Sequence, residues 1–251
     1  MRRVALVTGA GSGIGAGIAR VLAERGWHVV VNDLDAKTAH EVALEIGGVA
    51  VPGDVAAEPS EIVARSVAEC GRLDGLVNNA GIIRRMPLSE PDDEGIDATY
   101  AVNLRAVVRL SAAALPHLIE TAGSVVNIAS MAAEIPQLGG GLYGATKAGV
   151  VALTRQAAVE WGPLGVRVNA VGPGMVRTAM AEAVYADPEL YERRRRLVPL
   201  GRIGAPEDIG RVVAFLLSPD AGYVTGQHIV VDGGLSHTLM SHIPQPPTAG
   251  T

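Results

Sequence analysis

The chain of 251 residues is poor in several residue types, and each shortage argues against a class of protein. Cys70 is the single cysteine, which excludes an intramolecular disulfide and a cysteine-rich metal site. Aromatic residues make up only 3% of the chain, so stacking platforms for single-stranded nucleic acid are not expected. The net charge of −5 argues against a broad basic face for nucleic acid or anionic lipid.

Long apolar runs and metal-binding patterns are also missing. No run approaches the roughly 18 residues of a membrane span, and the apolar stretch at 4–7 is too short for the core of a signal peptide. The six histidines form neither an H-x-x-x-H nor an H-E-x-x-H pattern, so no metal site is expected. We therefore expect a cytoplasmic protein that binds neither membrane nor nucleic acid.

The chain is rich in short β-branched runs that alternate with longer, alanine-rich segments. The runs predict strands at 4–8, 28–32, 48–52, 75–78, 124–129, 166–171 and 228–231. Helical periodicity marks the segments near 14–25, 36–46, 59–70, 98–119, 144–161 and 206–217. The strand runs are continuously apolar, as expected when both faces of a sheet are covered. This pattern predicts an α/β fold with a doubly wound, seven-stranded parallel sheet in a single domain, residues 1–235, followed by a tail, residues 236–251.

The segment TGAGSGIG, residues 8–15, follows the first predicted strand and opens the first helix. Its glycines allow a tight turn and close approach of a pyrophosphate, while the helix amino terminus near Ile14 supplies free N–H groups and a positive dipole. The pattern departs from G-x-G-x-x-G, because Ala16 stands where the third glycine would be. No Lys-Ser or Lys-Thr pair follows, which excludes a Walker A loop. The turn predicts a dinucleotide site of the Rossmann type.

Asp33 bears on the choice of dinucleotide. It ends the second predicted strand, where a carboxylate would accept hydrogen bonds from an adenosine ribose diol. Asp35 is better placed to cap the helix that follows. No lysine or arginine lies in the glycine turn or directly after Asp33, so a 2′-phosphate would meet only repulsion. NAD is therefore expected rather than NADP.

Tyr143 and Lys147 lie four residues apart in the segment YGATK, at the start of a predicted helix, and so share one helix face. A cation held beside a phenol favours the phenolate and lowers the pKa of the phenol from about 10. A lone Y-x-x-x-K pair also occurs by chance in ordinary helices. The pair gains meaning only together with the other motifs.

Taken in order, these motifs resemble the short-chain dehydrogenase/reductase family, from Val4 to about Gly234. TGAGSGIG is similar to the family's cofactor motif, and GDV at 53–55 to its adenine-contacting segment. NNAG at 78–81 resembles the end of the fourth strand, and Asn103 the asparagine of the fourth helix. Ser130 lies thirteen residues before Tyr143, and VGPGMVRT at 171–178 resembles the Pro-Gly turn.

The resemblance implies hydride transfer between NAD and a secondary alcohol or ketone, without a metal. Tyr143 would be the general acid/base, and Lys147 would lower its pKa and hold the nicotinamide ribose. Ser130 would hydrogen-bond the substrate oxygen, and Asn103 would position a water that links Lys147 to solvent. The implied cofactor-binding residues are Gly9, Ser12, Gly13, Ile14, Gly15, Asp33, Asp54, Val55, Asn79, Ala80, Gly81, Tyr143, Lys147, Pro173, Gly174, Val176 and Thr178.

The substrate stays open between two classes. GIIRR at 81–85 resembles sugar-acid members of the family such as gluconate 5-dehydrogenase and deoxygluconate dehydrogenase. The arginine run at 193–196 either grips an anionic substrate or forms a solvated helix face. Against an anion, the residues expected around the substrate are apolar and suit a less polar alcohol or ketone: Met131, Leu138, Met175 and Met180.

Two other functions compete with this prediction. One is an NADPH-dependent 3-oxoacyl reductase, which Asp33 disfavours. The other is a non-catalytic, NAD-binding regulatory protein, which the intact set Asn103, Ser130, Tyr143 and Lys147 disfavours.

The predictions for the assembly and the tail start from apolar residues that packing against one face of the sheet does not use. Small and apolar residues on the helices at 98–119 and 144–161, which pair between subunits in the resembling family, predict a homotetramer. The tail either closes over a substrate pocket through residues 239–243 or frays like most chain ends.

Overall fold

The fold places one parallel sheet between two layers of helices. The computed structural model describes residues 2–178 and 186–238. Its sheet has seven strands in the order β3-β2-β1-β4-β5-β6-β7, all paired in parallel. The strands are β1 Val4–Val7, β2 His28–Val31, β3 Val49–Ala50, β4 Gly75–Asn78, β5 Ser124–Ile128, β6 Arg167–Pro173 and β7 His228–Val231. The predicted fold class is confirmed.

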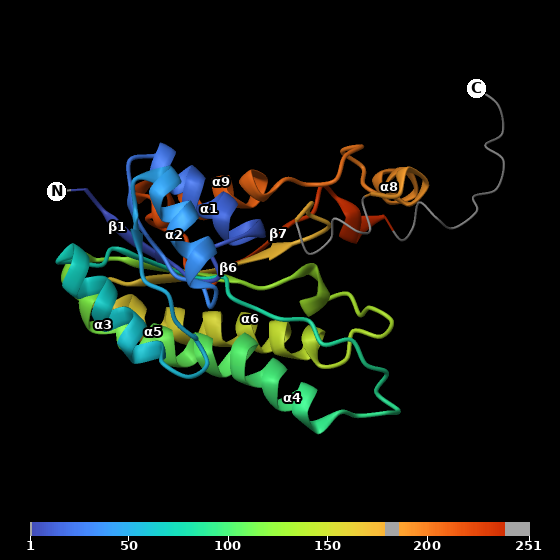
Figure 1. The fold of residues 1–251 in the computed structure, drawn as a ribbon, viewed down its shortest axis with the longest axis horizontal. Coiled ribbons are helices and arrows are strands. Elements are labelled where there is room, and N and C mark those ends of the chain that lie inside the picture. Colours follow the sequence, from blue (N-terminus) through green and yellow to red (C-terminus); the bar gives the residue numbers. More distant parts are fainter. Residues whose placement is uncertain (1, 179–185, 239–251) are drawn as a thin grey trace.

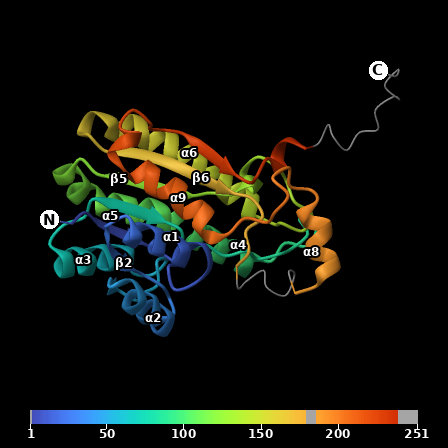
Figure 2. The same cartoon turned by 90° about the horizontal axis from the view of Figure 1, so that it is seen from above.

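Helices cover both faces of the sheet (Figure 1). One layer holds α1 Gly13–Glu24, α2 Ala36–Ile46 and α9 Pro206–Leu217, and the other holds α3 Pro59–Cys70, α5 Ala106–Thr121 and α6 Tyr143–Trp161. The predicted helix at 98–119 starts earlier, as α4 Asp93–Tyr100, and runs through a π-helical segment, Ala101–Arg105, into α5. The arginine run lies on α8 Pro188–Arg195 and just after it. Figure 2 shows α8 beyond one end of the sheet.

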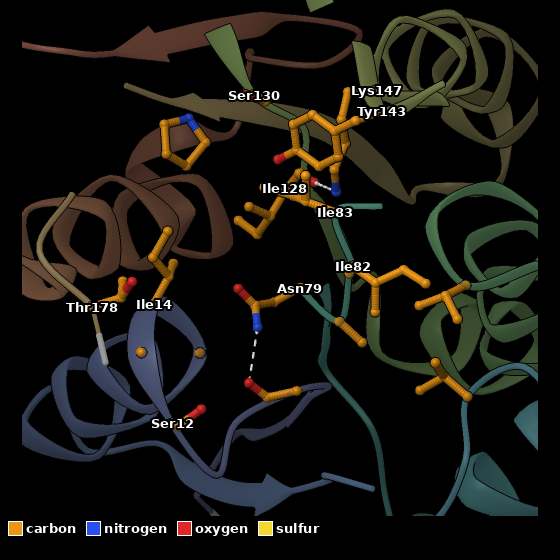
Figure 3. A pocket seen from close by; sticks show the side chains of 18 of the residues that line it. Ser12, Ile14, Asn79, Ile82, Ile83, Ile128, Ser130, Tyr143, Lys147 and Thr178 are labelled. Atoms are coloured by element: carbon orange, nitrogen blue, oxygen red, sulfur yellow. Dashed lines mark hydrogen bonds between the residues drawn. The ribbon is translucent and has the colours of Figure 1, made fainter. Parts of the chain in front are cut away.

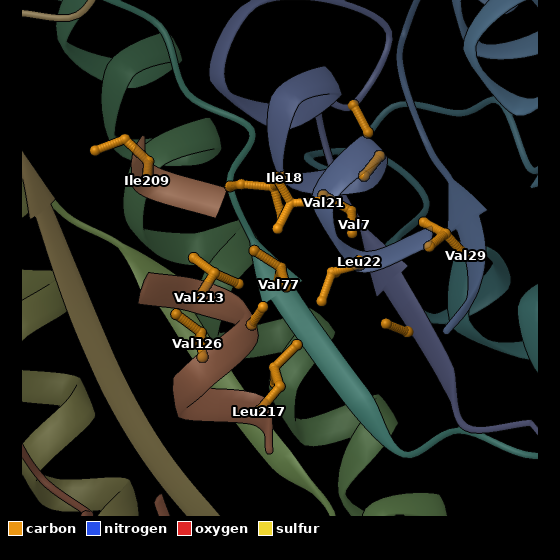
Figure 4. Packing of buried hydrophobic residues seen from close by; sticks show 14 of the residues in the cluster. Val7, Ile18, Val21, Leu22, Val29, Val77, Val126, Ile209, Val213 and Leu217 are labelled. Atoms are coloured by element: carbon orange, nitrogen blue, oxygen red, sulfur yellow. The ribbon is translucent and has the colours of Figure 1, made fainter. Parts of the chain in front are cut away.

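Alternating strand residues build the two halves of the core. Val7 and Val77 face α1 and α9, where Leu22 and Val213 are buried against them (Figure 4). Their neighbours Leu6 and Leu76 face the opposite layer, because successive side chains of a strand point to opposite faces. Burial contributes about 25 cal/mol per Å² of apolar surface. Because the strands are apolar on both faces, this stabilisation is gained in full only when helices cover both sides of the sheet.

The layer of α1 and α9 packs closely because both helices carry glycine at the contact. A Cβ at Gly17 would overlap Pro206, and one at Gly210 would come within 2.9 Å of Val21. The glycine turn at the start of α1 is thereby held firmly over the end of β1. Across residues 2–178 and 186–238, no helix has both the length and the apolar character of a membrane span. The same residues contain no cluster of three metal-ligating side chains.

Candidate active site

A cavity of 1030 Å³ lies where β1, β2, β4, β5 and β6 end, at the carboxyl edge of the sheet. Parallel α/β sheets bind ligands at this edge, where the strand order reverses. Every residue that the sequence analysis assigned to cofactor binding lines this cavity, and so does Ser130. Figure 3 shows Ser130, Tyr143 and Lys147 on one side, with Ser12 and Ile14 across from them and Asn79 between.

The glycine turn presents an open helix end to the cavity. Helix α1 begins at Gly13, and its N-cap residue Ser12 makes no side-chain hydrogen bond to the first turn, which also holds no acidic residue. In contrast, Asp35 caps α2 by accepting from the N–H groups of Lys37 and Thr38. Free N–H groups and the positive end of the helix dipole therefore face the cavity at α1, as an anionic pyrophosphate requires.

Close approach explains two glycines of the turn. A Cβ at Gly15 would overlap the carbonyl oxygen of Gly9, and Gly9 itself has φ of +61°. Asn79 fixes the turn from β4, since its amide donates to the carbonyls of Thr8 at 2.8 Å and Gly9 at 3.0 Å. The cradle thus fits a dinucleotide, with Asn79 holding its shape.

The segments that follow β2 and β3, residues 32–34 and 53–55, line one side of the cavity, which we call the acidic end. The Asp33 carboxylate accepts hydrogen bonds from the N–H of Gly11 at 2.9 Å and of Asp35 at 3.1 Å. Asp54 accepts from the N–H of Ala56 at 2.8 Å. Two carboxylates and no basic side chain belong to this acidic end.

Helix α6 places Tyr143 and Lys147 at the centre of the cavity. Lys147 is 4% exposed; its Nζ donates to the carbonyl of Ile128 at 2.8 Å and lies 5.8 Å from the Tyr143 ring centroid. Ser130 follows β5, accepts a hydrogen bond from the N–H of Ala132 and forms another with Tyr143. The spacing along one helix face and the turn after β5 therefore bring these three side chains together.

The pKa values in the site follow burial. Burial raises the pKa of Tyr143 above 10, and the hydrogen bond with Ser130 only partly offsets the rise. Burial also lowers the pKa of Lys147 to about 8. The protein alone therefore does not lower the pKa of Tyr143 as the sequence analysis expected. The Lys147 ammonium and a positively charged oxidised nicotinamide are the charges that would act in that direction.

Asn103 lies behind the cavity rather than on its wall. Its side chain, fully buried in the π-helical segment, accepts from the N–H of Ile82 at 2.8 Å and donates to the carbonyl of Ile82 at 2.9 Å. It also donates to Thr146 at 3.3 Å. A π-bulge re-aims a side chain within a helix, and here it pins the segment after β4 to α6. The water-positioning role of Asn103 stays a prediction.

The residues expected around the substrate are not brought together. Leu138 is fully exposed, and Met175 packs with Tyr191, Val198 and Ile203. Neither they nor Met131 line the cavity, and Met180 lies outside the described residues. Apolar character alone does not determine which segments face Tyr143, because tertiary packing places them, and the substrate-binding role of these four residues stays a prediction.

Other residues line the cavity in their place. Arg84 and Arg85 follow β4, and Arg194 comes from α8; these three form what we call the arginine rim. The motif GIIRR pointed to the first two, and the arginine run at 193–196 contains the third. The other residues not assigned from the sequence are Asn32, Leu34, Gly53, Ile82, Ile83, Met86, Asp92, Val102, Ile128 and Ala129.

Comparison with known proteins agrees with this geometry. A sequence profile described as enoyl-(acyl carrier protein) reductase matches residues 9–236. A 3-oxoacyl-(acyl-carrier-protein) reductase from Thermotoga maritima is 37% identical, with 93% of this chain and 97% of the relative covered. The cis-4-hydroxycyclohexanecarboxylate dehydrogenase of Sinomonas cyclohexanicum is 40% identical, with 92% and 96% covered.

Solved structures of similar proteins also match the fold of this chain. A short-chain type dehydrogenase/reductase from Mycobacterium ulcerans superposes with a TM-score of 0.88 at 34% identity, covering 94% of this chain and 90% of that one. A protein from Agrobacterium tumefaciens, provisionally assigned as a gluconate dehydrogenase, has a TM-score of 0.88 at 32% identity, covering 94% and 97%. The chain belongs to the short-chain dehydrogenase/reductase family, as its motifs and its site indicate.

Proposed function

We propose that this protein is an NAD-dependent oxidoreductase that interconverts a secondary alcohol and a ketone. The proposal rests on one observation: Tyr143, Ser130 and Lys147 line the same cavity as the uncapped amino terminus of α1. A proton-transferring phenol and a dinucleotide cradle in one cavity are the parts that hydride transfer to a carbonyl needs.

Each side chain has a defined task in this proposal. The bound cofactor supplies hydride exchange at its nicotinamide ring. Tyr143 exchanges a proton with the substrate oxygen through its hydroxyl, and Ser130 donates a hydrogen bond to the same oxygen. Lys147, buried beside the ring, stabilises the phenolate while that proton is away.

The acidic end supports NAD over NADP. Two N–H groups hold the Asp33 carboxylate at the cavity wall, where it can accept hydrogen bonds from a ribose diol. A 2′-phosphate there would face Asp33 and Asp54 with no basic side chain among the lining residues of that end. We expect NAD to be preferred by at least about 100-fold in kcat/KM, roughly 2.7 kcal/mol.

The second candidate is an NADPH-dependent 3-oxoacyl reductase. Its support is the relative from Thermotoga maritima, which carries the name of a 3-oxoacyl-(acyl-carrier-protein) reductase. The two candidates differ in the cofactor and in the need for a thioester, so one assay separates them.

That assay follows absorbance at 340 nm with NADH and NADPH separately, over secondary alcohols, sugar acids, simple ketones and a 3-oxoacyl thioester. The proposal expects turnover of a ketone or alcohol with NAD(H) and at most about 1% of that kcat/KM with NADP(H). Turnover confined to the thioester with NADPH selects the second candidate. No turnover with either cofactor would indicate a non-catalytic, cofactor-binding protein.

We further propose a homotetramer, on the support of α5 and α6. Val107, Leu110 and Val150 are taken up by the core of the chain. Val108 and Val159, on the same two helices, are 45% and 75% exposed. Exposed apolar positions on neighbouring helices suit burial between subunits. Light scattering should give about four times 25.8 kDa, and a monomer at micromolar concentration contradicts the proposal.

A further inference from the structure

The arginine rim is the part of the cavity that a generic alcohol or ketone does not explain. Arg84, Arg85 and Arg194 all line the cavity that contains Tyr143, yet the cofactor's phosphates are already provided for at α1. Asp92 is the acidic residue on this side of the cavity. The formal charge of these four side chains is +2, whereas the chain as a whole carries −5.

The backbone that carries Arg84 and Arg85 is tied to the reacting centre. Ile82 is fixed by Asn103 through two hydrogen bonds, and Met86 forms a bridge with Gly140. The carbonyl of Gly140 in turn accepts from the N–H of Tyr143 at 3.1 Å, where α6 begins. The two arginines therefore stand on a segment held next to the start of the catalytic helix.

These two side chains are available to a ligand. Within residues 2–178 and 186–238, neither Arg84 nor Arg85 takes part in an ion pair, although both are exposed. On α8, by contrast, Glu192 engages Arg195 at 2.7 Å and Arg196 at 2.8 Å. Arg194 is the member of the arginine run that reaches the cavity.

We propose that the substrate carries a carboxylate, which the arginine rim binds while Tyr143 and Ser130 engage the reacting oxygen. The proposal rests on the proposed function and adds the chemical class of the substrate to it. Guanidinium groups bind carboxylates through paired, charge-assisted hydrogen bonds. A ketone or alcohol with a carboxylate at its far end spans the two groups and is fixed at both.

An acidic carrier protein is the less suitable occupant. Its negative surface would approach a chain whose own net charge is −5, and like net charges slow association. The arginines also line the cavity that contains Tyr143, which a small anion can enter. A phosphorylated ketone has the same charge chemistry, so a phosphorylated ketone and its neutral parent are compared as well.

The test compares ketones that differ only in charge, at low ionic strength with NADH. The probes are 4-oxocyclohexanecarboxylate and 4-oxopentanoate, each with its neutral carboxamide, dihydroxyacetone phosphate with dihydroxyacetone, and an acetoacetyl thioester of an acyl carrier protein. The parent should prefer at least one carboxylate over its amide by about 30-fold or more in kcat/KM. The preference should shrink as salt rises, because exposed charges are screened.

Two variants and a control locate the effect. Arg84→Gln with Arg85→Gln, and separately Arg194→Gln, should raise KM for the carboxylate about tenfold or more, while turnover of the amide and the Kd of NADH stay within twofold. Arg193→Gln is the control, since Arg193 is exposed on the same helix and does not line the cavity; its constants should match the parent's.

Several results would overturn the proposal. Equal use of carboxylates and amides, or arginine variants that leave the preference intact, removes the rim from recognition while the proposed function stands. A tenfold preference for the phosphorylated ketone, or for the carrier-protein thioester, assigns the rim to that ligand instead. Failure of every ketone and alcohol with NAD(H) contradicts the proposed function itself.

Discussion

The two ends of the cavity are built in opposite ways. At the acidic end, backbone groups hold the polar side chains: Asp33 accepts from the N–H groups of Gly11 and Asp35, and Asn32 donates to the carbonyls of Val51 at 2.9 Å and Gly53 at 3.2 Å. At the arginine rim the side chains are long: Arg84 and Arg85 are exposed, Arg194 is partly exposed, and Leu138 nearby is fully exposed. The first end is part of the sheet, and the second is carried by segments attached to it.

This contrast separates what the family fold fixes from what one chain can vary. A dinucleotide needs a rigid cradle, because its position relative to Tyr143 decides whether hydride transfer is possible. A substrate pocket on exposed segments tolerates substitution, because changes there do not disturb the core. The acidic end should therefore control cofactor choice and the arginine rim substrate choice, with Tyr143 and Lys147 common to both.

Substitution of Lys147 has the largest expected effect, because Lys147 is expected both to bind the cofactor and to stabilise the Tyr143 phenolate. Lys147→Met should lower kcat by about 10³-fold, within the range of a lost acid–base group, and should raise the Kd of NADH. The same change should stabilise the fold at pH 7. Burial depresses the pKa of Lys147 to about 8 from 10.5, so keeping it charged costs up to about 3 kcal/mol at roughly 1.4 kcal/mol per tenfold change in acidity.

The sign of this stability effect depends on pH. Between pH 8 and 10.5 the unfolded chain binds more protons than the folded chain, so the free energy of unfolding of the parent rises with pH. Below pH 8 Lys147 is charged in both states, so the folded chain bears the full cost of burying the charge. Lys147→Met also loses the hydrogen bond to Ile128. After allowing for that loss, the free energy of unfolding of Lys147→Met should exceed that of the parent by about 1–2 kcal/mol at pH 7. Urea unfolding at pH 7 and pH 10.5 checks this, and a variant no more stable at pH 7 contradicts it.

Asp33 gives the next effect, confined to the acidic end. Asp33→Ala should reduce the NAD preference from at least about 100-fold to below about tenfold, through weaker NAD binding and less repulsion of a 2′-phosphate. The ratio of kcat/KM values for NAD and NADP measures it. Asp35→Ala is the matched control: it removes the cap of α2 and should cost about 1 kcal/mol of stability without changing the ratio.

The smallest effect concerns a contact behind Ser130. His228 on β7 is buried, and its Nδ1 lies 2.9 Å from Oε1 of Glu134, just after the turn that Ser130 begins. Glu134→Gln should lower the free energy of unfolding by less than about 1 kcal/mol, because the Glu134 side chain is 59% exposed. It should lower kcat two- to fivefold and leave the Kd of NADH unchanged. A changed Kd with an unchanged kcat would show that the contact does not position Ser130.

The sequence predicted the sheet and the cradle well, for a physical reason. Strands such as β4 and β5 are apolar on both faces, and the glycine turn must follow β1 directly, so local patterns determine both. The π-helical segment around Asn103 was not predicted, because it depends on hydrogen bonds to Ile82, twenty-one residues earlier. Leu138 and Met175, which are expected around the substrate, lie off the cavity, because tertiary packing rather than apolar character decides which side chains line it. The direction of the Tyr143 pKa also depends on burial, which the spacing of YGATK does not contain.

The central claim is that the Tyr143 hydroxyl transfers a proton to or from the substrate in a site that still binds NAD when that hydroxyl is absent. Tyr143→Phe removes only the titrating oxygen, and Tyr223→Phe, on a fully exposed ring, is the control. The direct measurement is turnover at 340 nm on the best substrate, together with a fluorescence titration of NADH. Tyr143→Phe should keep the Kd of NADH within twofold and lose at least about 100-fold in kcat, while Tyr223→Phe should match the parent. Turnover by Tyr143→Phe within tenfold of the parent would contradict it.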